Sequence, residues 1–86
     1  MPKALSVHRA IVPSSDRTRY VERLKVRKEH YVRAGCKFWV FEEAALPGAF
    51  IEFTEAVDAA TLTKAHVGAP ESMLDPSRIY TEVELT

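Results

Sequence analysis

Apolar and polar residues alternate along three of four short segments of the chain, and the remaining one (residues 36–43) is apolar on both faces. Both patterns predict β-strands. The segments cover residues 4–12, 36–43, 50–55 and 78–85. The first places Leu5, Val7 and Ile11 on one face, and Ser6, His8, Ala10 and Val12 on the other. In the last, the face expected to point inward is formed by Ile79, Thr81, Val83 and Leu85.

The two middle strands are predicted to form a hairpin that is unusually rich in aromatic side chains. Residues 35–58 hold five of the eight aromatic residues, namely Phe38, Trp39, Phe41, Phe50 and Phe53. Pro47 and Gly48 lie between the two apolar runs, and this pair is typical of a turn. The strand before the turn is apolar on both faces, so each face needs a separate covering layer.

Between these strands the apolar spacing changes to that of a helix. Residues 17–34 carry an i, i+4, i+7, i+11 stripe formed by Tyr20, Leu24, Arg27 and Tyr31. Ser14, Ser15 and Asp16 offer an N-cap, and Gly35 suits the left-handed residue after the last turn. A shorter helix is predicted over residues 59–67, capped by Asp58 and followed by Gly68.

The predicted order β-α-β-β-α-β is that of a ferredoxin-like α+β sandwich with a four-stranded antiparallel sheet, formed by residues 1–86 as a single domain. Right-handed crossovers place both helices on one face of that sheet. Trp39 and Phe41 would then lie on the uncovered face, where each would expose a large apolar area. We therefore expect a homodimer packed sheet to sheet.

Composition narrows the functional class mainly by exclusion. No apolar run approaches the length of a membrane span, and the first residues lack the apolar core of a secretion signal. Cys36 is the single cysteine, so neither an internal disulfide nor a CxxC metal site is expected. These features favour a cytoplasmic protein that does not act at a membrane.

Charge is distributed unevenly along a chain whose net charge is zero. Residues 1–40 carry ten Lys and Arg against three Asp and Glu, and residues 41–86 carry two against nine. A basic helix could meet nucleic acid, but no aromatic stacking platform accompanies it. A solvent-facing basic helix is the preferred interpretation, and no nucleic-acid partner is expected.

Three sets of residues are candidates for chemistry. His66, near the end of the second helix, could act as a base or simply interact with the helix dipole. An aromatic pocket between helices and sheet would be formed by Tyr20, Tyr31, Trp39, Phe41 and Phe53, although aromatic residues at such spacings also form ordinary cores. His8 and Glu52 are interpreted as an ion pair at the subunit interface, in preference to a metal site that Glu82 or Glu84 would complete.

Several positions resemble the dimeric α/β-barrel superfamily, in particular its antibiotic-biosynthesis-monooxygenase-like (ABM-like) small proteins. They are Gly35-Cys36, Phe38-Trp39, Pro47-Gly48, Phe53-Thr54-Glu55, Asp58, Ala65-His66 and Pro70. The resemblance implies a dimer and a pocket-facing His66. The chain departs from it at Val57, where many relatives have Trp, and it contains no Asn for an Asn-Trp-His triad.

Two hypotheses follow. In the first, the protein is a monooxygenase that needs no cofactor and acts on a small aromatic or quinol-like substrate, with His66 as the base. In the second, it is a non-catalytic dimeric module that binds a small ligand or has a structural role. A cavity of several hundred Å³ would favour ligand binding, and a filled core would favour the structural role.

Overall fold

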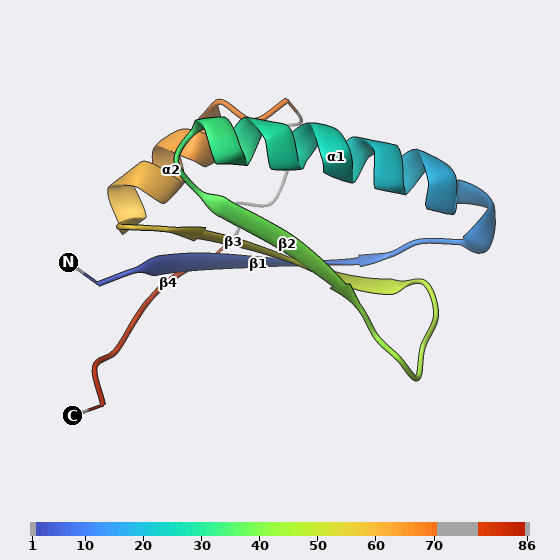
Figure 1. The fold of residues 1–86 in the computed structure, drawn as a ribbon. Coiled ribbons are helices and arrows are strands. Elements are labelled where there is room, and N and C mark those ends of the chain that lie inside the picture. The colour runs from blue at the N-terminus through green and yellow to red at the C-terminus, as the bar shows by residue number, and fades with distance from the viewer. Residues whose placement is uncertain (1, 71–77, 86) are drawn as a thin grey trace.

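A computed structural model describes residues 2–70 and 78–85 of the protein as two helices above a four-stranded sheet. The elements are β1 Ala4–Ile11, a 3₁₀ turn Ser14–Asp16, α1 Arg17–Arg33, β2 Lys37–Glu42, β3 Ala49–Ala56, α2 Ala59–Val67 and β4 Ile79–Thr81. The strand order is β2-β3-β1-β4, and every neighbouring pair is antiparallel. Both helices lie on the same side of the sheet (Figure 1). The predicted ferredoxin-like α+β fold is therefore confirmed.

The helix boundaries follow the predicted signals with one exception. Gly35 adopts φ +83° after α1, and the Asp58 carboxylate accepts a 2.8 Å hydrogen bond from the backbone N–H of Thr61. The exception is the start of α1, where Asp16 makes no side-chain capping bond. A 3₁₀ turn precedes α1 there, and the backbone N–H of Asp16 donates to the carbonyl of Pro13.

The last strand is shorter than predicted. Only residues 79–81 pair with β1, and Val83 and Leu85, which were expected to point inward, are 74% and 93% exposed. The register explains the difference. Thr81 lies opposite Ala4, so the following residues run past the beginning of β1, and the last contact is the Glu82 N–H donating to the Lys3 carbonyl.

The sheet has one covered and one open face. Side chains of the covered face and the helices form the buried core, which comprises Ala4, Tyr31, Cys36, Phe38, Ala56, Leu62 and Ala65. On the open face, the Trp39 and Phe53 rings stack 6.2 Å apart and Phe41 meets Phe53 edge-on at 5.7 Å. Phe41 remains 53% exposed, as expected for a strand that is apolar on both faces.

In the part of the chain that the structure describes, neither helix is long and apolar enough to cross a bilayer.

Candidate functional site

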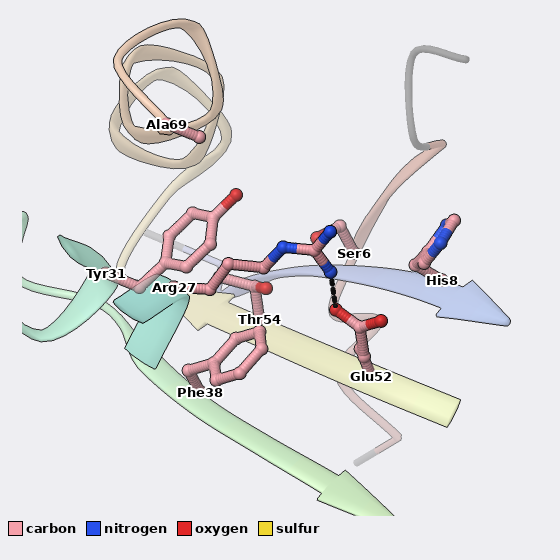
Figure 2. Close-up of a pocket in the computed structure, with 8 residues that line it drawn as sticks. All are labelled: Ser6, His8, Arg27, Tyr31, Phe38, Glu52, Thr54 and Ala69. Atoms are coloured by element: carbon pink, nitrogen blue, oxygen red, sulfur yellow. Dashed lines mark hydrogen bonds and ion pairs between the residues drawn. The ribbon is translucent and has the colours of Figure 1, made fainter. Parts of the chain in front are cut away.

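Polar side chains gather on the covered face of the sheet, beneath α1 and α2. They surround a cavity of about 10 Å³, which accommodates about one water molecule. Its walls include Ser6, His8 and Thr54 from the strands and Arg27 and Tyr31 from α1 (Figure 2). Because strand side chains alternate between faces, Ser6 and His8 of β1 both point to this side, as do Glu52 and Thr54 of β3.

His66 of α2 is hydrogen-bonded to two of these cavity residues, Tyr31 and Ser6. Its Nδ1 lies 2.7 Å from the Tyr31 hydroxyl and its Nε2 lies 2.9 Å from the Ser6 hydroxyl. Both hydroxyl-bearing residues line the cavity. Since both ring nitrogens are engaged, His66 can exchange a proton with the cavity only through Tyr31 or Ser6.

Burial keeps this cluster in its neutral form. Desolvation, aided by the nearby His30, lowers the pKa of His66 below its ordinary value of 6.5. Burial likewise raises the pKa of the Tyr31 phenol, so that its hydroxyl stays protonated. If Tyr31 donates to Nδ1, the remaining ring proton sits on Nε2 and donates to Ser6, which is a consistent tautomer for a base.

A buried ion pair forms another wall of the cavity. Arg27 of α1 contacts Glu52 of β3 at 2.7 Å, and the hydroxyl of Tyr20 donates to the same carboxylate at 2.9 Å. The Glu52 side chain is only 2% exposed, so these partners replace the water that the carboxylate loses. Burial, and after it the hydrogen bond to Glu52, raises the pKa of the Tyr20 phenol.

His8 and Glu52 lie opposite each other in the register of β1 and β3. Both belong to the helix-covered face, not to the open face where a second subunit was expected. Figure 2 shows the Glu52 carboxylate reaching Arg27, with His8 to its other side at the cavity. Glu52 is thus bound to Tyr20 and Arg27 of α1, and the role of His8 and Glu52 at an interface stays a prediction.

The five aromatic residues expected to line one pocket fall into two groups. Tyr20 and Tyr31 are buried beneath α1 on the covered face. Trp39, Phe41 and Phe53 form the cluster on the open face. The sheet separates the two groups because β2 is apolar on both sides, so the described structure does not bring all five together.

Sequence reasoning did not assign Ser6, Arg27 or Thr54 to the site. One signal was present for Arg27, since it occupies the apolar stripe of its helix while Glu52 occupies a covered position of its strand. Two opposite charges at buried positions are expected to pair. Ser6 gave no comparable signal, because its hydroxyl becomes informative only when α2 brings His66 against it.

Among the described residues, no group of three His, Cys, Asp or Glu side chains is arranged to hold a metal ion.

No protein-family model and no curated protein matches the sequence. Solved structures match the fold, among them a conserved protein from Methanosarcina mazei Go1 with 15% identity and a TM-score of 0.73, covering 95% of this chain and 92% of that one. A Nitrosomonas europaea protein named "putative antibiotic biosynthesis monooxygenase" gives 14% identity and a TM-score of 0.73, covering 96% and 90%. Rv0793 from Mycobacterium tuberculosis gives 15% identity and a TM-score of 0.58, covering 100% and 97%. The likeness to ABM-like proteins expected from the sequence is thereby confirmed at the level of the fold.

Proposed function

We propose that the protein is a monooxygenase that needs no cofactor and oxidises a small phenol or quinol at the polar cavity beneath α1 and α2. The observation that carries the proposal is the hydrogen-bonded chain from Ser6 through His66 to Tyr31, in which Ser6 and Tyr31 also line the cavity. The fold shared with the Nitrosomonas europaea protein supports the same reaction class by analogy.

The chain of hydroxyls and imidazole supplies the base that this chemistry requires. A substrate hydroxyl passes its proton to Tyr31 while Tyr31 passes its own proton to the neutral His66. His66 is thus a positioning residue that holds the proton, and Tyr31 is the residue that touches the substrate. The lowered pKa of His66 keeps its lone pair available at neutral pH.

The deprotonated substrate then supplies the electrons that reduce dioxygen. For a quinol, one oxygen atom enters the ring and the other leaves as water, giving a hydroxyquinone, so that quinol and dioxygen balance hydroxyquinone and water. No external reductant is consumed. The protein contributes a dry site, a base and hydrogen-bond donors.

Oxygen uptake tests the proposal. We expect dioxygen consumption with a panel of phenols and quinols, and a loss of about 10²-fold or more in kcat for His66→Gln and Tyr31→Phe. Tyr80→Phe is the matched control, since Tyr80 lies on the open face and is exposed. The wild-type rate is expected to fall as pH decreases through the pKa of His66, which burial holds below 6.5, and His66→Gln should lack that acidic limb. No uptake by the wild type, or equal rates in His66→Gln, would refute it.

The cavity volume favours a second candidate, a dimeric module without catalysis. Room for about one water does not admit a quinol unless lining side chains move. In this interpretation the polar cluster only ties the helices to the sheet. Thermal-shift measurements with the same panel separate the cases, because a structural module shows neither oxygen uptake nor stabilisation by any aromatic ligand.

The open aromatic face supports a homodimer packed sheet to sheet in either case. Trp39, Phe41 and Phe53 form one contiguous apolar cluster there. Leaving such a cluster in water is unfavourable. In a two-fold dimer, the same apolar face of a second copy covers it.

A further inference from the structure

On the open face of the sheet, Arg9 is a positive charge next to apolar side chains. Arg9 shares this face with Leu5, Val7 and Ile11 along β1, and it lies opposite Ile51 of β3. Among the residues that the structure describes, no carboxylate pairs with Arg9. A chain that covers this face must therefore offer Arg9 an acidic group, because a buried unpaired guanidinium is costly.

A groove of about 460 Å³ surrounds Arg9 near the end of β1. Its apolar walls come from Ile11, Phe41, Leu46 and Ile51. Of the two glutamates that also line it, Glu42 is already held by Arg17 through hydrogen bonds of 2.7 and 2.9 Å. Glu43 remains at the groove as a competitor for Arg9.

Residues 82–85 combine acidic and apolar side chains, which match the charge of Arg9 and the apolar walls of the groove. Glu82 and Glu84 alternate with Val83 and Leu85, the pattern of a strand, yet beyond Glu82 the segment has no strand partner in the described chain. Val83 and Leu85 are largely exposed. Apolar side chains in a strand-like pattern without a neighbour indicate a segment that is covered by another chain.

The direction and length of this segment agree with an intermolecular contact. Figure 1 shows residues 82–85 leaving the sheet on the side away from the helices, which is the side of the open face. Four extended residues reach about 13 Å, and facing sheets pack about 10 Å apart. The segment is therefore long enough to cross to the sheet of a second copy.

We propose that residues 82–85 of one copy lie in the groove around Arg9 of a second copy, where Glu82 and Glu84 pair with Arg9 and Leu85 covers the apolar walls. This inference rests on the proposed sheet-to-sheet dimer. A two-fold axis makes the contact twice. Residues 82–85 run past the start of β1 in their own copy, whereas the groove lies at the end of β1 in the other copy. The two β1 strands therefore face each other in antiparallel directions.

A charge swap tests the contact through the dimer dissociation constant, measured by sedimentation on the full chain. Arg9→Glu and the double variant Glu82→Lys/Glu84→Lys are each expected to weaken the dimer about tenfold or more. Combining the three substitutions is expected to restore the constant to within about threefold of wild type, since opposite charges again meet.

Two further variants make the result specific. Glu22→Lys/Glu29→Lys changes the net charge equally on exposed positions of α1 and should leave the constant unchanged. Glu43→Lys should fail to rescue Arg9→Glu. A wild-type dimer that is insensitive to both Arg9→Glu and the double variant, or rescue by Glu43→Lys alone, would overturn the contact while leaving the dimer intact. A monomeric wild type would overturn both.

Discussion

At the scale of single residues, the molecule places two charges where a small domain normally has apolar side chains. Arg27 and Glu52 are both largely removed from water and form a direct ion pair at the wall of the cavity. A buried pair of this kind adds little net stability compared with apolar residues, but each member depends strongly on the other. Its position beside Tyr31 is consistent with a site retained for chemistry.

A substitution of Arg27 measures how strongly buried Glu52 depends on its partner. Arg27→Met is expected to lower the free energy of unfolding by about 3–5 kcal/mol, because it leaves the Glu52 carboxylate buried without the guanidinium. Urea unfolding monitored by circular dichroism gives the value. Arg33→Met removes one partner of the exposed Arg33–Glu29 pair and should cost no more than about 1 kcal/mol. Equal losses in the two variants would show that burial of the first pair is not decisive.

The titration of His66 gives a second prediction. Because its pKa in the folded protein lies below the ordinary 6.5, the unfolded chain binds the proton more readily. The free energy of unfolding of the wild type should therefore fall as pH decreases from 6.5 towards the folded pKa of His66. Above pH 6.5, the titration of His66 should not change it. His66→Gln, which cannot titrate there, should lose less stability over the same interval. Parallel unfolding midpoints of the two proteins from pH 7.5 to 5 would contradict the lowered pKa.

At the scale of elements, the hairpin of β2 and β3 depends on its own turn, which is hydrogen-bonded to the residue that follows β1. The Gly48 carbonyl accepts a 2.8 Å hydrogen bond from the Val12 N–H, and the Gly48 N–H donates to the Glu42 carboxylate. Gly48 has φ +95°, and an added Cβ would lie 2.7 Å from the Val12 carbonyl oxygen. The turn therefore requires glycine for both its conformation and its close approach.

A pair of glycine variants separates these two requirements. Gly35 also has a positive φ, but nothing lies within 4 Å of an added Cβ. Gly35→Ala is expected to cost roughly 1–2 kcal/mol from left-handed strain alone. Gly48→Ala should cost clearly more, since the backbone of Val12 must also shift. Chemical denaturation compares the two variants, and a smaller loss for Gly48→Ala would contradict the predicted clash.

The elements were largely predictable from local patterns, and the cavity was not. Gly35, Asp58 and the alternation in β1 and β3 each determine local geometry by themselves. The contact of His66 with Ser6 joins residues sixty positions apart, and it depends on how α2 packs on β1. The prediction for β4 was wrong beyond Thr81, because alternation does not reveal where the neighbouring strand begins.

At the scale of the whole molecule, the sheet separates the side covered by the helices from an open side that carries an aromatic cluster. The covered side holds the cavity and the proposed base, and the open side holds the Trp39, Phe41 and Phe53 cluster. The five aromatic residues expected to form one pocket lie on opposite faces of the sheet. Period-two alternation could not predict this, because it does not show which face the helices cover. If a second copy covers the open side, each copy of the chain keeps its own cavity.

The oligomeric state tests this account most directly. Multi-angle light scattering at micromolar concentration is expected to give twice the chain mass of 9.7 kDa for the wild type. Phe41→Asp should shift the mass towards a single chain, because it places a carboxylate in the centre of the interface. Val67→Asp adds the same charge at an 82% exposed position of α2 and should remain dimeric. A single-chain mass for the wild type, or no change in Phe41→Asp, would contradict the account.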